Sequence, residues 1–426
     1  MTTDQTGASQ PHGSAHRSTF FRQSGWLMIA NVANGFFMVF VHFLSKKIPE
    51  SEYGIFGTML ALAMCVPMIP MQMVLAQQTA HALATNRLRE LAGTIRMIWI
   101  GTFVLCLAGA LVALMFQAQI LERWSITNPM SFWITLPVIL LSLWFPMFCG
   151  VLQGQQNFMW LGWSMIFNGV GRLAVATLAV MVFAAHAAGM MAGVLMGLAF
   201  ATSVALWHSR SLWMLPPLPC DKRAVLSQVI PLMLGFGAFQ FLFTADTMFV
   251  KAYFNADETG FYVAAGTMSR ALMWLVTPLA MVMFPKIVHS TARSQESDLM
   301  VPVLLGTGAL AAVGAVGLWV IGPFAVRLMF KDTYVNVAAS VLPWYALAML
   351  PLAMANVLLN NLLARSSFKI VPFLVLLAVG YGWALTRFHD TLTTVLKTMG
   401  VCNLLLLALC VCFTWCGTKS KAATST

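Results

Sequence analysis

Twelve long apolar stretches, separated by short polar segments, constrain the fold of this 426-residue chain more than any other feature. Each stretch can cross a hydrocarbon core of ~30 Å as an α-helix, which takes roughly 20 residues. Charged residues make up only 9% of the sequence, whereas a soluble domain carries about 25%. Because a helix satisfies its own backbone hydrogen bonds in lipid, we expect an all-α integral membrane protein with about twelve transmembrane helices. The predicted spans are Gly25–Leu44, Gly54–Ala76, Met97–Gln117, Phe132–Leu152, Trp160–Phe183, Ala188–Trp207, Val229–Val250, Phe261–Phe284, Met300–Gly322, Val337–Leu359, Ile370–Thr386 and Val395–Cys416.

The second half of the sequence repeats features of the first. A shift of 206 positions, from residue 54 to residue 260, superimposes short motifs of the two halves without a gap. The matching pairs are Glu52 with Glu258, Gly54 with Gly260, Phe56 with Tyr262, and Leu136-Pro137 with Leu342-Pro343. Because six helices per half is an even number, the two copies share an orientation and are related by an axis along the membrane normal. We therefore predict two pseudo-symmetric six-helix lobes.

The predicted division of the chain follows from these spans. It consists of an N-terminal tail at 1–24, a first lobe at 25–207, a connecting loop at 208–228, a second lobe at 229–416 and a C-terminal tail at 417–426. If the N-terminus is cytoplasmic, fourteen Lys and Arg residues lie on the cytoplasmic side and eight on the other side. Positive charge gathers in cytoplasmic loops, so we expect both termini and the connecting loop in the cytoplasm. The net charge of +11 is explained in the same way and does not indicate nucleic-acid binding.

Polar residues recur on common helical faces inside the spans. The polar pairs are Asn31 and Asn34 in the first span, Asn168 and Arg172 in the fifth, and Gln240 and Thr244 in the seventh. Such stripes hold membrane helices together or line water. Their presence on the first and seventh spans, which are equivalent in the repeat, favours a cavity between the lobes. No carboxylate occurs in the first six predicted spans, so an arginine there indicates water or an anion beside it.

One carboxylate, Asp246, lies inside the predicted spans, and Arg270 lies in the next span. We expect Arg172 and Arg270 to hold a phosphate group, because guanidinium donors form a planar fork that matches phosphate oxygens. Two interpretations of Asp246 stay open. It forms a fixed salt bridge with Arg270, or it is a switchable coupling carboxylate whose protonated form is favoured when the site closes and loses water.

The stretch from Gln240 to Pro285 carries a family resemblance. Asp246 and the apolar residues after it, the run from Glu258 to Ala265, Arg270 and the closing Phe284-Pro285 resemble two adjacent helices of bacterial polysaccharide-type flippases. These flippases belong to the multidrug/oligosaccharidyl-lipid/polysaccharide (MOP) exporter superfamily. The resemblance implies a MATE-like two-lobed fold in the bacterial cytoplasmic (inner) membrane. It also implies that an undecaprenyl-pyrophosphate-linked oligosaccharide, of the kind used for O-antigen and other polysaccharides, is moved to the outer leaflet by alternating access.

Two other functions agree less well with the sequence. A cation or drug antiporter of the same superfamily typically uses carboxylates in the first lobe, and the predicted spans there hold none. A membrane glycan polymerase or glycosyltransferase needs a long outer loop with catalytic acids, and the predicted outer loops are short. We find no nucleotide, metal or nucleophile motif, and therefore expect no enzyme activity, no cofactor and no nucleic-acid partner. The expected partners are the lipid-linked glycan, membrane lipids and other membrane proteins of glycan assembly.

Overall fold

The computed structural model describes residues 12–219, 221–273, 300–364 and 367–422, and within these ranges the chain is helical, without strands. The elements are α1 (His12–Phe40), η1 (Val41–Lys47), α2 (Glu50–Met64), α3 (Met68–Thr85), α4 (Leu88–Met115), α5 (Gln117–Arg123), α6 (Pro129–Gly154), α7 (Phe158–Met181), α8 (His186–Trp213), α9 (Lys222–Tyr253), α11 (Met300–Met329), α12 (Thr333–Ala364), η2 (Phe368–Ile370), α13 (Val371–Arg387) and α14 (Leu392–Ala422). A further helix occupies residues 256–273, and we call it helix 256–273.

The predicted spans agree with these helices. Eleven helical segments of the described residues are long and apolar enough to cross a membrane, and each contains or closely overlaps one predicted span. The remaining predicted span, Phe261–Phe284, begins in helix 256–273 and continues outside the described residues. The all-helical membrane fold expected from the sequence is therefore confirmed.

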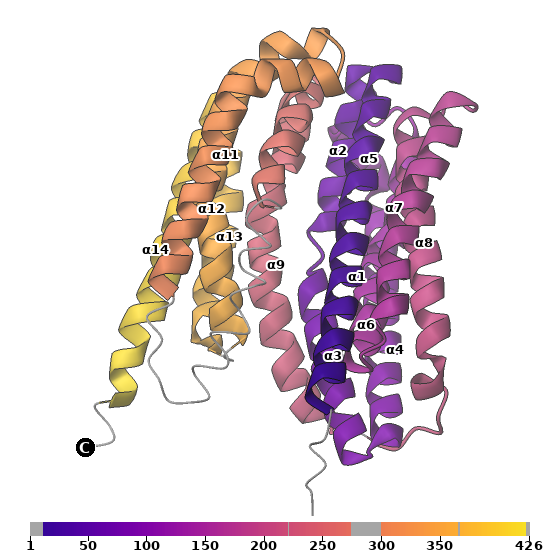
Figure 1. Cartoon of the computed structure of the whole chain (residues 1–426). Coiled ribbons are helices and arrows are strands. Elements are labelled where there is room, and N and C mark those ends of the chain that lie inside the picture. The colour runs from indigo at the N-terminus through magenta and orange to yellow at the C-terminus, as the bar shows by residue number, and fades with distance from the viewer. Residues whose placement is uncertain (1–11, 220, 274–299, 365–366, 423–426) are drawn as a thin grey trace, which may run out of the picture.

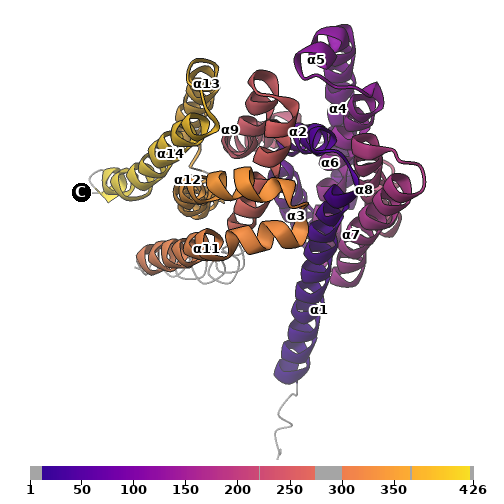
Figure 2. The same ribbon diagram turned by 90° about the horizontal axis from the view of Figure 1, so that it is seen from above.

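The helices gather into two groups joined along α9 (Figure 1). In the first group α7 packs on α1 and α8, and α6 packs on α3 and α8. In the second group α12 packs on α11 and α14. Figure 2 shows α9 between α2 and the group formed by α12, α13 and α14, and α9 packs on α2, α3 and α13. We refer to residues 25–207 and 229–416 as the N-terminal and C-terminal halves.

Both chain ends point to the same end of the molecule. α1 begins and α14 ends at the lower end in Figure 1, as an even number of crossings requires. We call the opposite end, where α5 and the α11–α12 connection lie, the far end. The ribbons of α1 and α11 lie close together at the far end and diverge toward the lower end, and α11 packs on η1.

The repeated glycines meet each other at the contact between the halves. A Cβ atom added to Gly54 would lie 3.0 Å from the backbone N of Gly260, and one added to Gly260 would lie 2.2 Å from the carbonyl oxygen of Glu50. One turn further, a Cβ on Gly57 would overlap Val263, at 2.2 Å from Cγ1. Small residues allow membrane helices to approach so closely. The aligned motifs of the repeat therefore form the crossing of α2 with helix 256–273.

Polar contacts reinforce this closure at the far end. Lys331 donates to the carbonyl of Ile48 at 2.7 Å and forms an ion pair with Glu50 at 3.6 Å. The hydroxyl of Thr333 donates to Glu50 at 2.8 Å, and Ser45 donates to the backbone of α11 at 3.4 Å. Each of these bonds joins the N-terminal half to the C-terminal half.

Two local features differ from the expectation. The predicted span Gly54–Ala76 is interrupted at Pro67, where α2 ends and α3 begins, because proline cannot donate to the helix ladder. Glu50, Glu52 and Glu90, which the sequence places between spans, lie in the first turns of α2 and α4. Carboxylates are favourable there because they complement the positive end of the helix dipole.

Candidate functional site

Arg172 is a buried arginine for which the described part of the chain supplies no acidic partner. It lies on α7, and only 7% of the residue is exposed. Its Nε has no hydrogen-bond acceptor, and in the part of the chain that the structure describes the side chain forms no ion pair. A Cβ on Gly197 of α8 would lie 2.9 Å from the backbone N of Arg172. This close helix contact fixes the backbone that carries the guanidinium group.

Asn168 of α7 and Asn34 of α1 lie close to this part of α7. Asn168 is one helical turn from Arg172 and only 4% exposed. Asn34 faces α7, since a Cβ on Gly169 would lie 3.1 Å from its Oδ1, and this buried oxygen has no hydrogen-bond partner. Asn31, expected in the same cluster, is exposed on α1. Three of the predicted polar residues thus gather on the α1–α7 contact, and the fourth lies on the surface.

A hydrogen-bonded pair connects this cluster to the other half. His42 lies on η1, and η1 packs on α7, the helix that carries Arg172. His42 Nδ1 and the Tyr53 hydroxyl are 2.7 Å apart. The same hydroxyl lies 3.4 Å from Oγ1 of Thr267 on helix 256–273. Tyr53 is fully buried, and its ring packs on Phe330 with centroids 5.4 Å apart.

Asp246 and Arg270 form a buried salt bridge in the C-terminal half. Arg270 Nη2 donates to both Asp246 oxygens, at 2.9 and 3.1 Å, and to Thr247 at 2.8 Å, while Nε donates to the carbonyl of Phe243 at 3.3 Å. Two tyrosine hydroxyls also donate to Asp246, that of Tyr262 at 2.8 Å and that of Tyr345 at short range. The Asp246 side chain is 0% exposed and that of Arg270 15%. Asp246 therefore faces helix 256–273 and α12 rather than open space.

Gln240 and Thr244 have a different environment from the one the sequence suggested. Gln240 Nε2 donates at 2.8 Å to the carbonyl of Met64, the last residue of α2. The Thr244 hydroxyl lies 3.1 Å from Cys65 Sγ, and Thr244 is fully buried. The break at Pro67 leaves carbonyls at the end of α2 without helical donors, and α9 supplies one. In this conformation these two side chains join α9 to the end of α2.

Three tyrosines that were not predicted as site residues complete the site. Tyr53, Tyr262 and Tyr345 are each fully buried. A buried tyrosine hydroxyl generally has a hydrogen-bond partner. A tyrosine within an apolar span therefore indicates a polar contact inside the membrane. The repeat alignment already placed Tyr262 in the motif that includes Gly260.

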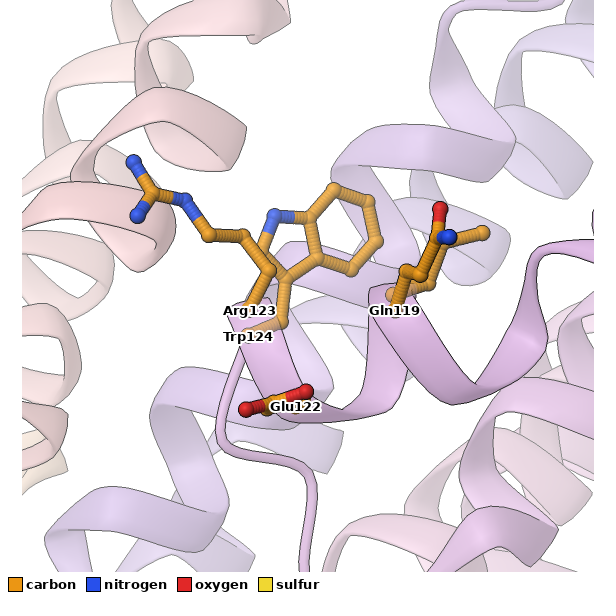
Figure 3. A pocket seen from close by; sticks show the side chains of 5 residues that line it. Gln119, Glu122, Arg123 and Trp124 are labelled. Carbon is orange, nitrogen blue, oxygen red and sulfur yellow. The ribbon is translucent and has the colours of Figure 1, made fainter.

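A surface recess lies elsewhere on the molecule, at α5. It has a volume of about 690 Å³ and is lined by Gln119, Ile120, Glu122, Arg123 and Trp124. Figure 3 shows that all five side chains come from α5 and the residue after it, with Gln119 across from Arg123 and Trp124. The Arg123 guanidinium lies 4.8 Å from the ring centre of Tyr253 on α9. Because one short helix supplies the whole lining, the recess does not bring together groups from both halves.

Solved structures identify the fold. A multidrug resistance MATE family transporter of the MOP superfamily, in an inward-facing conformation, is similar with a TM-score of 0.68 at 12% identity, covering 94% of this chain and 96% of that chain. The lipid II flippase MurJ in an inward closed conformation is similar with a TM-score of 0.68 at 12% identity, covering 92% and 87%. A MOP superfamily transporter from Pyrococcus furiosus, described for the reverse polarity of its binding pocket, has a TM-score of 0.57 at 14% identity, covering 95% and 96%. The chain therefore has the MOP-superfamily transporter fold.

The family is defined by the sequence itself. The family model of the lipid II flippase MurJ matches residues 43–425, and the chain belongs to this family. No curated protein matches the sequence. The superfamily suggested by the motifs between Gln240 and Pro285 is confirmed, and the chain is a membrane transporter of a lipid-linked substrate rather than an enzyme. The family matched is that of the lipid II flippases, so the polysaccharide-type subfamily stays a prediction.

Proposed function

We propose that this protein moves an undecaprenyl-pyrophosphate-linked glycan from the inner to the outer leaflet of the bacterial cytoplasmic membrane by alternating access. The observation that carries the proposal is Arg172, which is 7% exposed and lacks an acceptor for Nε. A buried charge without a partner is expensive in a membrane protein. A pyrophosphate would supply both the opposite charge and the acceptor oxygens.

The two arginines have different roles in this proposal. Arg172 is available to the substrate, whereas the Nε and Nη2 groups of Arg270 already donate to Asp246, Thr247 and the carbonyl of Phe243. We therefore assign the primary anion contact to Arg172. Arg270 contributes its positive charge near the site and would bind phosphate directly only after release from Asp246.

The arrangement of the halves supports the direction of transport. With both termini in the cytoplasm, as the charge distribution indicates, the contacts among Ser45, Glu50, Lys331 and Thr333 close the outer end. A closed outer end is a feature of an inward-facing state, and the ribbons of α1 and α11 diverge toward the termini (Figure 1). Loading from the inner leaflet requires such a state.

The family favours lipid II, the peptidoglycan precursor, as the first substrate to test. An O-antigen-type oligosaccharide on the same carrier is the alternative suggested by the sequence resemblance. Both carry a prenyl pyrophosphate, so the Arg172 contact serves either one, and the sugars must distinguish them. Other membrane proteins of glycan assembly would supply the substrate and receive the product.

A cation or drug exporter is less compatible with the site. Asp246 is already neutralised by Arg270 and accepts two tyrosine hydroxyls. A cationic substrate would also be repelled by the unpaired Arg172. The similarity to MATE transporters shows the fold alone at 12% identity.

The test is flipping by purified protein in liposomes, with fluorescent lipid II and, in parallel, a fluorescent undecaprenyl-pyrophosphate oligosaccharide. Exposure of the headgroup is followed with a membrane-impermeant quencher. Arg172→Gln should reduce the rate by about tenfold or more, since hydrogen bonds to charged groups contribute roughly 1.5–3 kcal/mol. Arg172→Lys should recover part of it, because a point charge lacks the fork.

The matched control is Arg327→Gln, which removes an arginine that is 70% exposed on α11. It should flip at the wild-type rate. Failure of the wild-type protein to flip either lipid would refute the proposed function. Wild-type flipping by Arg172→Gln would refute the assigned anion contact.

A further inference from the structure

A directional hydrogen-bond chain crosses between the halves at Tyr53. The Thr267 hydroxyl donates to the carbonyl of Val263 at 2.9 Å, so toward Tyr53 it can only accept. Tyr53 is therefore the donor in the 3.4 Å contact with Thr267. Since Tyr53 has one hydroxyl proton, the arrangement that satisfies both contacts has His42 Nδ1–H as the donor in the 2.7 Å contact. The bonds run from His42 through Tyr53 and Thr267 to Val263.

The first member of this chain lies beside the unpaired arginine. η1, which carries His42, packs on α7, which carries Arg172. α1 lies along α7 with Trp26 at Gly162 and Asn34 at Gly169, and this register places the start of η1 beside Arg172. An anion bound to Arg172 would therefore lie next to the His42–Tyr53 pair, in which the Tyr53 hydroxyl can donate to the anion while the Nδ1–H of His42 holds the Tyr53 oxygen. Hydrogen bonds to an ionised acceptor are roughly twice as strong as neutral ones. Phosphate oxygens would thus compete with the long Tyr53–Thr267 contact for the tyrosine proton.

We propose that His42 and Tyr53 complete the anion site at Arg172, and that Tyr53 transmits occupancy of this site to the far-end closure by releasing Thr267. This inference rests on the proposed function, because it takes the anion to be the substrate's pyrophosphate. It adds one binding residue, Tyr53, a residue that positions it, His42, and a link between binding and opening.

The position of Thr267 explains how anion binding would affect the contact between the two halves. Thr267 is one turn from Val263, whose side chain packs against Gly57 at the crossing of α2 with helix 256–273. Tyr53 also packs on Phe330 and Tyr334 at the far end. Release of Thr267 leaves no orphaned group, because its hydroxyl keeps its bond to Val263 while the anion accepts from Tyr53. A bound anion would thereby weaken one contact that holds the outer end closed.

The experiment uses the full chain in nanodiscs, with farnesyl pyrophosphate as the added anion. Affinity is measured by calorimetry, and opening is measured by hydrogen–deuterium exchange of peptides covering residues 41–56 and 256–267. In the wild type, farnesyl pyrophosphate should raise deuterium uptake in both peptides. Tyr53→Phe keeps the packed ring and removes the hydroxyl, so it should lower the affinity by about tenfold and abolish the rise in uptake.

Thr267→Val separates binding from coupling. It should keep wild-type or slightly tighter affinity, because the competing acceptor is gone, and should show raised uptake without ligand. The matched control is Tyr334→Phe, because the buried Tyr334 hydroxyl has no hydrogen-bond partner. This variant should behave as the wild type in both measurements.

The outcomes separate this inference from the proposed function. Wild-type affinity and response in Tyr53→Phe, or wild-type uptake in unliganded Thr267→Val, would overturn the inference. Arg172→Gln tests the anion site on which the inference depends. If that variant loses binding while Tyr53→Phe is unaffected, the Arg172 contact of the proposed function stands, and both the added Tyr53 contact and the coupling are wrong. If Arg172→Gln binds farnesyl pyrophosphate normally, the anion site of the proposed function is wrong as well.

Discussion

Removing the charge of Asp246 is the sharpest test of how the C-terminal half is built. In Asp246→Asn the Arg270 guanidinium keeps its place but loses its counter-charge, and the new amide NH₂ competes with Arg270 and two tyrosines for acceptors. If the pair is a fixed structural element, this variant should be destabilised. If Asp246 is a switchable coupling carboxylate, the variant should fold normally and fail to transport.

The structure gives the expected size of the effect. Breaking a buried ion pair by removing one partner costs about 3–5 kcal/mol. The Asp246 side chain is fully buried and that of Arg270 is 15% exposed, so solvent screens the remaining charge only slightly. We expect a loss of about 3 kcal/mol in the free energy of unfolding. Asp246→Asn combined with Arg270→Gln should recover about 1–3 kcal/mol of it, because the uncompensated charge is gone.

The assay is reversible unfolding in mixed micelles with increasing denaturing detergent, followed by tryptophan fluorescence. Asp332→Asn is the matched control, since the Arg327–Asp332 pair has side chains 70% and 83% exposed. Exposed pairs contribute about 0–1 kcal/mol, so this variant should unfold as the wild type. Wild-type stability of Asp246→Asn, together with lost flipping, would refute the structural interpretation and support the switch.

Three further predictions test the packing and the topology. Gly260→Ala should destabilise the protein by about 1–3 kcal/mol, because the new Cβ would lie 2.2 Å from a carbonyl oxygen of α2, whereas Gly35→Ala, with nothing within 4 Å, should not lower the melting temperature. Arg96→Gln removes two hydrogen bonds to backbone carbonyls of the connecting loop, that of Trp213 at 3.0 Å and that of Leu215 at 3.1 Å. This variant should therefore be cleaved faster by proteases within residues 214–219. Reporter fusions after Thr426 and within residues 216–221 should both report the cytoplasm, and an external signal from either would contradict the topology.

Most of the fold could be predicted because the length of each apolar segment, a local property of the sequence, determines where the membrane helices lie. Apolar length alone located the spans, but it did not show the break at Pro67 that divides the second predicted span into α2 and α3. The repeat alignment went further, since it paired Gly54 with Gly260, which then meet at the crossing of two helices. The residue spacing did not show which neighbouring helix each polar face packs against. Gln240 and Thr244 bind the end of α2 because a carbonyl is free there, and this depends on the partner helix.

The candidate site was predicted in part for the same reason. Charges in apolar spans are visible in the sequence, so Arg172, Asp246 and Arg270 were found. The hydroxyl donors were missed because their pairing is tertiary. Tyr345 reaches Asp246 from α12, 99 positions further along the chain. Tyr53 meets Thr267 from 214 positions away.

The two halves share a repeated crossing but have diverged in how each compensates its buried arginine. In the C-terminal half, Asp246 neutralises Arg270 and two tyrosines hold the carboxylate in place. In the N-terminal half, α7 carries Arg172, and the described residues supply no acid that pairs with it. The contacts of Tyr53 with His42 and Thr267 join this half to helix 256–273, which carries Arg270. Because Arg270 has a counter-charge among the described residues and Arg172 has none, our proposal places the anionic substrate at Arg172.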